Sequence, residues 1–593
     1  MSPSGHRTPR GVGALMAALV LVITACGSPP DVSRSPSRST VSEAPSSAPA
    51  STGPFRAMTV PATGEAPCDE ADPPDTSHAA YTGELKRIRA KDARTVVFEL
   101  CGPDVAFAAK LATPSLAIND TAWLQSKIEP GGGDPQILTE VNGTGPYRLD
   151  QWSHGSDITL VRNEAYWGHP GIPGAVVFRW RDDAGARLSD LRASTVDAID
   201  QVAPTDAQDV TADPDLRTLV RPGWNVAYIG FNNRFAPFDT VGVRQAIAMG
   251  IDRDKIVATL YPPGTEVASR FTPCSIPHGC SGQAWYESDP VAARDVLSLA
   301  GFKSGFKTVI HYPTESRDYL PNPLGVAVEL QAQLKANLGI VADLDPLPFD
   351  GLVAAADAGK LGGIYLLGAR ASYPDALDFL GTHFGPDASA QFGNRWNDIA
   401  GALDKAAATP DDAKRDKLFT AANDAIRRHV PMIPLAHVGT LTAYRADVRD
   451  PQVSGAGTER FAAVIPGDRG QFAWMGASEP RSLYCADEID PAALRVCAQV
   501  SEGLLAYDAI SAAIVPALAQ ACVPVADLTI WTCTLRAGVT FHDGAALDAN
   551  DVVLSFAAPW DAEHPLHRGR TGAFEPFLDR FGGFLHPPAT PSG

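Results

Sequence analysis

The sequence lacks the short motifs of the common catalytic and metal sites. It contains no Cys-x-x-Cys pair, no His-Glu-x-x-His pair and no Gly-x-Ser-x-Gly turn. The glycines of residues 142–146 are not followed by the Gly-Lys-Ser/Thr of a phosphate loop. Nothing nominates a nucleophile with its base, and no metal and no cofactor are predicted. An enzyme is therefore the least favoured class of function.

Basic residues are also scarce. Lysine and arginine number 49 against 68 aspartates and glutamates, and the formal net charge is −19. Nucleic-acid binding requires a basic face, so the charge balance argues against it. An acidic excess fits an exported body that stays monomeric because like charges repel.

Two histidine-containing segments are interpreted as structural. In Phe541-His542-Asp543-Gly544 the Asp-Gly pair follows strand-like residues, which favours a turn over catalysis. His564 and His567 could be metal ligands, but no third ligand stands at a useful spacing. An exposed loop is the favoured interpretation of that segment.

The first residues indicate export. Arg7 and Arg10 precede an apolar stretch over residues 11–22, and small residues follow it up to Cys26. The stretch is too short to span a membrane comfortably, so residues 1–25 are predicted to be a signal peptide. Its ending resembles the bacterial lipobox, which implies lipidation of Cys26. An ordinary signal peptide cleaved nearby is the alternative.

The chain beyond the signal divides by composition. Residues 26–67 are dominated by Ser, Pro, Thr and Ala, and we predict a disordered tether there. Residues 226–439 alternate strand and helix patterns, which predicts an α/β lobe with a parallel or mixed sheet. Residues 68–225 and 440–593 are richer in short strand-like runs. We expect them to form together a first lobe of two subdomains, assembled from both ends of the chain.

Local signals place several elements within these lobes. Asp252 is predicted to cap a helix over residues 253–260, and Asp289 a helix that begins at Pro290. Further predicted elements are a helix over 325–338 and strands over 95–100, 175–180, 308–312, 340–342, 364–367 and 472–474.

The cysteines predict a disulfide framework. Nine are present, and setting Cys26 aside leaves eight, an even number that favours disulfides in an exported protein. Three pairs lie close in sequence, and the two remaining cysteines make the fourth. The candidates are Cys274 with Cys280, Cys485 with Cys497, Cys522 with Cys533, and Cys68 with Cys101.

A series of motifs follows in order along the chain. They are Gly143-Thr144-Gly145-Pro146-Tyr147, Arg162-Asn163-Glu164-Ala165-Tyr166-Trp167, Phe231-Asn232-Asn233, Val243-Arg244-Gln245-Ala246-Ile247 and Ile251-Asp252-Arg253. Together they resemble the extracellular solute-binding proteins of family 5, the oligopeptide, dipeptide and nickel receptors of ABC importers. Each motif alone is weak, but their number and order make the resemblance strong over nearly all of residues 80–593. It implies a two-lobed periplasmic-binding-protein-like fold (type II, cluster C-like) with mixed α/β sheets and a ligand cleft.

The order of the segments differs from the family's. Segments that resemble the family's beginning, Glu502-Gly503-Leu504-Leu505 and Asp551-Val552-Val553-Leu554-Ser555-Phe556 among them, stand here at the C-terminal end. Each occurs once, which indicates a circular permutation; a chance fusion of two gene fragments is the alternative. The old termini would be joined within residues 450–470, and permutation is tolerated where termini are close.

The resemblance also implies candidate ligand contacts in the cleft. Peptide receptors of the family carry an acid that pairs with the peptide ammonium, and Ser372 stands at that position here. A serine cannot neutralise a buried cation, so we expect free peptides not to be the preferred ligand, unless Asp375 substitutes for the acid. The candidate ligand-binding residues are Ser372, Tyr373, Asp375, Glu479, Trp224, Asn232 and Trp396.

The favoured function is therefore a lipid-anchored, extracytoplasmic substrate-binding protein of an ABC importer. It would capture a peptide or another small organic solute by hinge closure and deliver it to a permease, acting as a monomer. A sensor or adhesion lipoprotein with the same fold is the alternative.

Overall fold

The computed structural model describes residues 55–68, 81–127 and 135–587. The predicted signal peptide, Cys26 and most of the predicted tether lie outside the described residues. The end of that tether is part of the fold: β1 (Thr59–Val60) pairs antiparallel with β2 (Leu85–Asp92), and the Met58 N–H donates to Asn550 Oδ1 at 2.8 Å. Hydrogen bonds to β2 offset the conformational entropy that these residues lose on becoming ordered. The Ser- and Pro-rich composition of the segment did not reveal this pairing.

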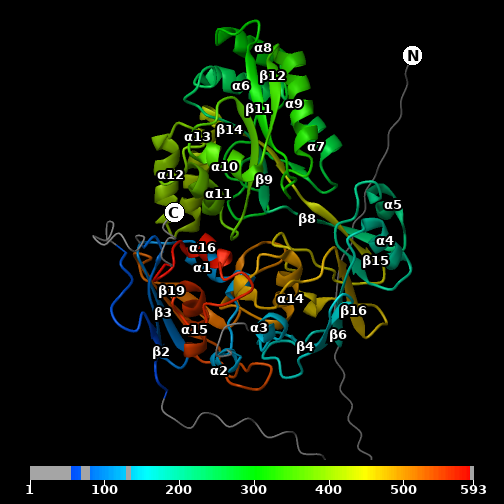
Figure 1. Ribbon diagram of the computed structural model, residues 1–593, viewed down its shortest axis with the longest axis vertical. Helices are drawn as coiled ribbons and strands as arrows, with labels where there is room; N and C mark the ends of the chain where they lie inside the picture. The colour runs from blue at the N-terminus through cyan, green and yellow to red at the C-terminus, as the bar shows by residue number, and fades with distance from the viewer. Residues whose placement is uncertain (1–54, 69–80, 128–134, 588–593) are drawn as a thin grey trace, which may run out of the picture. The chain divides into compact units, whose positions relative to one another are not determined.

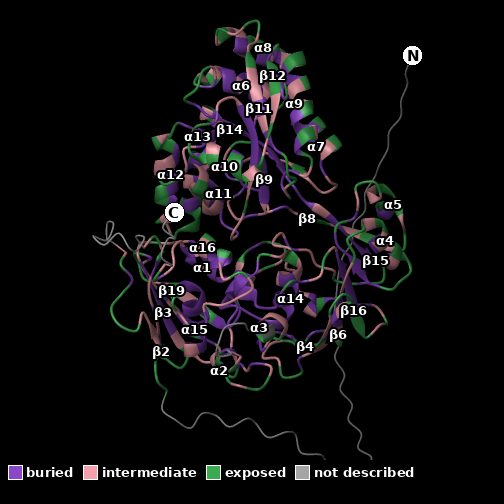
Figure 2. Ribbon diagram, in the orientation of Figure 1, coloured by how far each residue is buried: buried purple, intermediate pink, exposed green. Residues whose placement is uncertain are grey.

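One mixed sheet of six strands forms the centre of what we call the second lobe. Strand β11 runs parallel to both of its neighbours, β12 and β13. Strand β9 runs antiparallel to both of its neighbours, β13 and β14. Every residue of β9 is buried, as Figure 2 shows. The strands, in spatial order, are β10 (Glu266–Val267), β14 (Met432–His437), β9 (Asn225–Phe231), β13 (Ile364–Arg370), β11 (Lys307–Pro313) and β12 (Val341–Leu347).

Helices pack on this sheet and enclose one hydrophobic core with it. The local signals for two of them are confirmed, because Asp252 accepts from the Lys255 N–H and Asp289 accepts from the Val291 N–H. The helices are α6 (Val241–Gly250), α7 (Arg253–Leu260), α8 (Pro290–Leu299), α9 (Pro323–Leu338), α10 (Phe349–Asp357), α11 (Ala376–Phe384), α12 (Asn397–Ala407) and α13 (Asp412–His429).

A seven-stranded sheet belongs to what we call the first lobe. Apolar side chains cover both of its faces and form two separate cores. Its strands, in spatial order, are β4 (Tyr147–Ser153), β5 (Asp157–Arg162), β6 (Ala175–Trp180), β16 (Gln471–Gly476), β7 (Ala198–Ile199), β15 (Thr440–Arg445) and β8 (Leu216–Arg221). Its helices are α4 (Ala184–Arg192), α5 (Ala207–Ala212) and α14 (Pro491–Val500).

A five-stranded sheet completes the first lobe and brings the two ends of the chain together. Strand β3 (Thr95–Leu100) pairs antiparallel with β20 (Ile530–Leu535), and Figure 1 shows blue β3 in the same sheet as orange-red β19. The remaining elements of this part are β19 (Ala519–Pro524), β17 (Leu505–Tyr507), β18 (Ile514–Pro516), α1 (Phe107–Leu111), α2 (Thr121–Ser126), α3 (Pro135–Thr139), α15 (Ala549–Trp560) and α16 (Glu575–Phe581), with short 3₁₀ turns at Pro114–Leu116, Phe461–Ala463 and Cys485–Asp487.

The four predicted disulfides are all present. They join Cys68 to Cys101, Cys274 to Cys280, Cys485 to Cys497 and Cys522 to Cys533. The predicted turn at His542 to Gly544 is also present. Among the described residues, no helix has both the length and the apolar character that a membrane crossing requires.

Candidate functional site

A cavity of about 760 Å³ lies where the chain passes between the two lobes. Its wall includes the connection from β8 to β9, residues 222–224, and residues at the connection from β14 to β15. The second lobe contributes Arg317, Arg370 and Ser372, and the first lobe contributes Tyr507 and Arg580 among others. A volume of this size matches that of small-molecule sites, which commonly lie between domains.

The two connections are joined to each other through one side chain. Asn225 Nδ2 donates to the Val438 carbonyl at 2.9 Å, and the Val438 N–H donates to Asn225 Oδ1 at 2.8 Å. A Cβ on Gly223 would lie 2.1 Å from the same carbonyl, so only glycine allows this approach. Connections of this kind, few and next to each other, are where hinge motions of two-lobed proteins occur.

Aromatic side chains form an apolar part of the cavity wall. The rings of Trp224 and Tyr507 meet edge to face with centroids 5.8 Å apart. Gly455 makes room for the indole, because a Cβ at Gly455 would lie 2.0 Å from Trp224 Nε1. The half-exposed side chain of Ile489 also lines the cavity. A ligand with an apolar body can therefore pack here.

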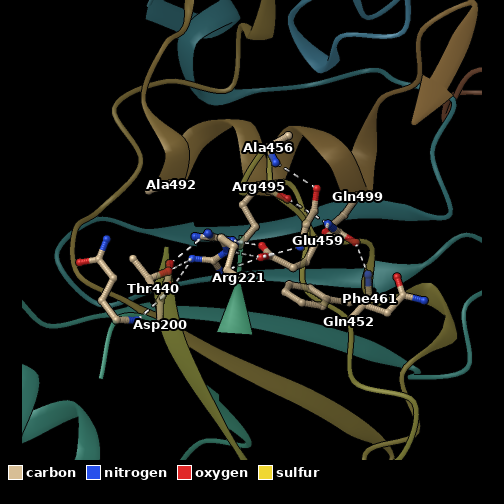
Figure 3. Close-up of polar contacts among 12 residues, drawn as sticks. Asp200, Arg221, Thr440, Gln452, Ala456, Glu459, Phe461, Ala492, Arg495 and Gln499 are labelled. Carbon is tan, nitrogen blue, oxygen red and sulfur yellow. Dashed lines mark hydrogen bonds and ion pairs between the residues drawn. The ribbon is translucent and has the colours of Figure 1, made fainter. Parts of the chain in front are cut away.

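Four buried charged residues form a cluster at the cavity (Figure 3), and all of them except Glu459 line its wall. Arg221 donates to Asp200 Oδ1 at 2.6 Å and to Glu459 Oε1 at 2.7 Å. Arg495 donates to Glu459 Oε2 at 2.7 Å and lies 3.0 Å from Asp200 Oδ2. The Glu459 side chain is completely buried. Two guanidinium groups and two carboxylates thus neutralise one another, and we call these four residues the buried charge cluster.

Two of the seven predicted ligand-binding residues, Trp224 and Ser372, line the cavity. The Ser372 backbone N–H donates to Asp378 Oδ2 at 2.5 Å, and its carbonyl accepts from Arg580. Burial raises the pKa of Asp378 to about 7, against the two backbone hydrogen bonds that lower it. The Ser372 hydroxyl makes no hydrogen bond with any described residue, so it remains open to a ligand.

The other proposed anchor, Asp375, has a structural partner instead. Its two oxygens pair with Arg415 Nη1 and Nη2, both at 2.7 Å, and both side chains are buried. Asp375 Oδ1 also accepts from the Leu377 N–H at 2.8 Å and so caps α11. Asp375 is not part of the cavity wall. Tyr373 also lies outside that wall, and Lys110 Nζ is 5.6 Å from the centre of its ring.

The remaining three predicted contacts have local structural roles. Glu479 accepts from Trp152 Nε1 at 3.0 Å, and Asn232 donates to the Gly359 carbonyl at 2.7 Å. Trp396 stacks on His429 with ring centroids 5.1 Å apart. None of the three belongs to the wall of the 760 Å³ cavity. Glu479 was a candidate because it follows a predicted strand, Asn232 because it lies beside the crossing between the lobes, and Trp396 because its ring could pack on a ligand.

A family profile matches residues 69–391 and 513–574, and its description is bacterial extracellular solute-binding proteins, family 5. The chain belongs to this family. Probable ABC transporter periplasmic-binding protein SapA of Escherichia coli is 28% identical over 393 residues, which cover 65% of this chain and 70% of that protein. Di/tripeptide-binding protein 1 of Pseudomonas aeruginosa is 28% identical over 392 residues, covering 65% and 72%.

The structure of HbpA2 from Haemophilus parasuis is similar to this family 5 chain in fold. The TM-score is 0.58 at 26% identity, over 62% of this chain and 72% of that one. The predicted fold class, a mixed α/β protein like the periplasmic solute-binding proteins, is therefore confirmed. The family consists of transport binding proteins and not of enzymes.

Sequence reasoning missed most of the charged residues of the cavity. Arg187, Arg317 and Arg580 line it but belong to none of the motifs that we singled out, and Arg370 begins the segment that contains Ser372 but was not itself a predicted contact. They are distant from one another along the chain, so no spacing pattern connects them. Tyr507 does belong to the family-like segment that begins at Glu502, and this membership was a usable signal. Within the described residues, no group of three His, Cys, Asp or Glu side chains could hold a metal ion.

Proposed function

We propose that this chain captures a small organic solute outside the cell membrane and delivers it to an ABC importer. The observation that carries the proposal is the 760 Å³ cavity at the connections between two lobes of a family 5 protein. Closure about these connections excludes water from the cavity, which strengthens each polar contact with the solute. The relatives named for ABC transport and for di- and tripeptide binding support the same class of function.

The proposal includes export and a lipid anchor at Cys26. It also includes the domain division at residues 68–225 with 440–593 and residues 226–439. The importer's permease is the expected partner, and a monomer is the expected state.

Native mass spectrometry of the full chain, purified after export, tests the proposal. We expect a discrete excess mass that disappears on denaturation and identifies the solute. Ser372→Trp places an indole in the cavity and should abolish the excess mass, whereas Ser304→Trp, in an exposed turn, should retain it. The denatured mass also reports whether the chain begins at a lipidated Cys26. If neither the wild type nor Ser304→Trp carries or takes up any solute, the proposed function is wrong.

We also propose that the chain is circularly permuted relative to its family. The segment that begins at residue 81 lies beside the C-terminal segment, because the Glu84 N–H donates to the Phe581 carbonyl at 2.7 Å and Trp560 Nε1 donates to the Tyr81 hydroxyl at 3.0 Å. A turn with Gly467 at φ +66° leads into β16, where we place the old junction. Adjacent termini are what permutation requires.

A chain in which the segments are returned to the order of the family tests the proposed permutation. Opening the chain at residues 467–470 and joining residue 587 to residue 81 by a short Gly/Ser linker leaves out β1 and Cys68 but keeps every other strand, so it should preserve the fold. We expect the same circular dichroism spectrum and a free energy of unfolding within about 1–2 kcal/mol of that of an unpermuted chain that begins at residue 81. Opening instead inside β9 serves as the control and should prevent folding, since β9 pairs on both sides in the core. Loss of folding in the first variant would contradict the permutation.

A further inference from the structure

The charges in the cavity wall are unbalanced. Six arginines and two aspartates line it. Both aspartates are already paired: Asp200 with the two arginines of the buried charge cluster, and Asp318 with Arg370. A positively charged solute would therefore find no unpaired carboxylate in this wall. An isolated ammonium in such a site is strongly unfavourable.

Arg317 could instead bind a negatively charged solute, because its guanidinium has hydrogen-bond donors that no described residue accepts from. Its Cζ lies 3.5 Å from the centre of the Phe349 ring, which orients the planar group. Within the described part of the chain, no carboxylate lies within ion-pair distance of it, and its buried Nε has no hydrogen-bond partner. The nearby Glu315 is solvent-exposed, and its carboxylate accepts from the Phe349 N–H at 2.9 Å.

Arg580, from the first lobe, contacts the loop of the second lobe that contains Ser372. Its Nη groups donate to the carbonyls of Ser372 and Pro576, and its buried Nε has no hydrogen-bond partner in the part of the chain that the structure describes. No carboxylate among the described residues forms an ion pair with it. Asp378, close by, accepts from the backbone N–H groups of Ser372 and Tyr373. Arg317 and Arg580 therefore leave positive charge without an ion-pair partner in the wall, one from each lobe.

We propose that the solute is an organic anion without a free ammonium group. Its carboxylate or other oxyanion pairs with Arg317 beside the Ser372 loop, and its apolar body packs on Trp224 and Tyr507. A planar guanidinium binds an oxyanion through two parallel hydrogen bonds, and exclusion of water strengthens the pair. This inference rests on the proposed function and adds the chemical class of the solute.

The test offers the full chain three forms of one dipeptide and, separately, the small-molecule fraction of a cell extract. The dipeptide Leu-Leu is a zwitterion, N-acetyl-Leu-Leu is an anion and Leu-Leu amide is a cation of nearly the same shape. Calorimetry measures binding of the dipeptides, and mass spectrometry identifies what the protein retains from the extract after gel filtration. We expect retained molecules to be anions without a free amine. Among the dipeptides that bind, the N-acetyl form should bind at least about tenfold more tightly than the amide.

Variants connect the result to the proposed contact. Arg317→Gln should lower retention of the anions by about 10- to 100-fold, whereas Arg94→Gln, exposed and outside the cavity, should leave it unchanged. Retention of molecules with a free ammonium, tight binding of the amide, or equal effects of the two variants would overturn the inference while leaving the proposed function intact. No retention of any molecule from the extract or the dipeptide set would contradict the proposed function itself.

Discussion

Replacing Glu459 with glutamine is expected to lower the free energy of unfolding by about 3–5 kcal/mol at pH 7. Glu459 is completely buried and pairs with Arg221 and Arg495, each through a contact of 2.7 Å. Without its charge, two buried guanidinium groups share the single carboxylate of Asp200. An uncompensated buried charge is the costly part, since exchanging a balanced pair for apolar side chains is often nearly neutral.

Urea unfolding followed by tryptophan fluorescence measures this effect. Glu563→Gln is the matched control, because Glu563 is exposed and its side chain makes no hydrogen bond or ion pair within the described residues. It should change stability by less than about 0.5 kcal/mol. The double variant Glu459→Leu with Arg495→Met removes one charge of each sign and should recover part of the loss. A decrease below about 1 kcal/mol for Glu459→Gln, or no recovery in the double variant, would show that charge balance does not stabilise this region.

The same cluster should make the protein sensitive to acid. Burial alone would raise the pKa of Asp200 and Glu459, but Arg221 and Arg495 hold both values below the ordinary ones. A carboxylate whose pKa is lower in the folded state contributes stability above its unfolded pKa of about 4 and loses it as the pH falls through the folded value. Stability should therefore fall with pH below about 4, and less steeply in Glu459→Gln.

Replacing Asp375 with alanine should destabilise the second lobe and should not act as the loss of a ligand anchor. The variant loses a buried pair with Arg415 that has two contacts of 2.7 Å, and it also loses the cap of α11. The first loss is worth about 3–5 kcal/mol and the second about 1 kcal/mol. Thermal and urea unfolding measure the sum.

Two further variants separate stability from binding. Asp375→Asn can still cap the helix and should be about 1 kcal/mol more stable than the alanine variant. Ser372→Ala removes a hydroxyl that lines the cavity and has no partner, so it should change solute affinity and leave stability unchanged. If Asp375→Ala remained stable and lost the solute, Asp375 would be an anchor after all.

Local sequence signals predicted much of the fold because their partners are close along the chain. Asp252 and Asp289 each cap a helix by accepting from an N–H two or three residues away, so the residue type and its position suffice. Strands such as β3 and β6 followed from runs of β-branched and aromatic residues. The disulfides followed from an even cysteine count and close spacing, and four bonds confirm them.

The site was less predictable because the role of a charged side chain depends on its partner. Asp375 stands in the segment that the family resemblance pointed to, yet Arg415, 40 residues further along, occupies its carboxylate. The four members of the buried charge cluster are spread over residues 200–495, and no spacing rule relates them. A buried charge is stable only beside its counter-charge, and the packing of the sheets decides which charges meet.

The family, the α/β class, the disulfide pairs and the presence of Ser372 where peptide receptors of the family carry an acid could all be predicted from the sequence. These depend on residue types in a linear order, which the sequence contains in full. Which side chains face the cavity became known from the folded structure. Arg317 and Arg580 lie in the wall without an acidic partner among the described residues, whereas Asp375 and Glu459 form internal pairs. Electrostatic interactions act through space over a few ångströms, and distance in space is the quantity that folding sets.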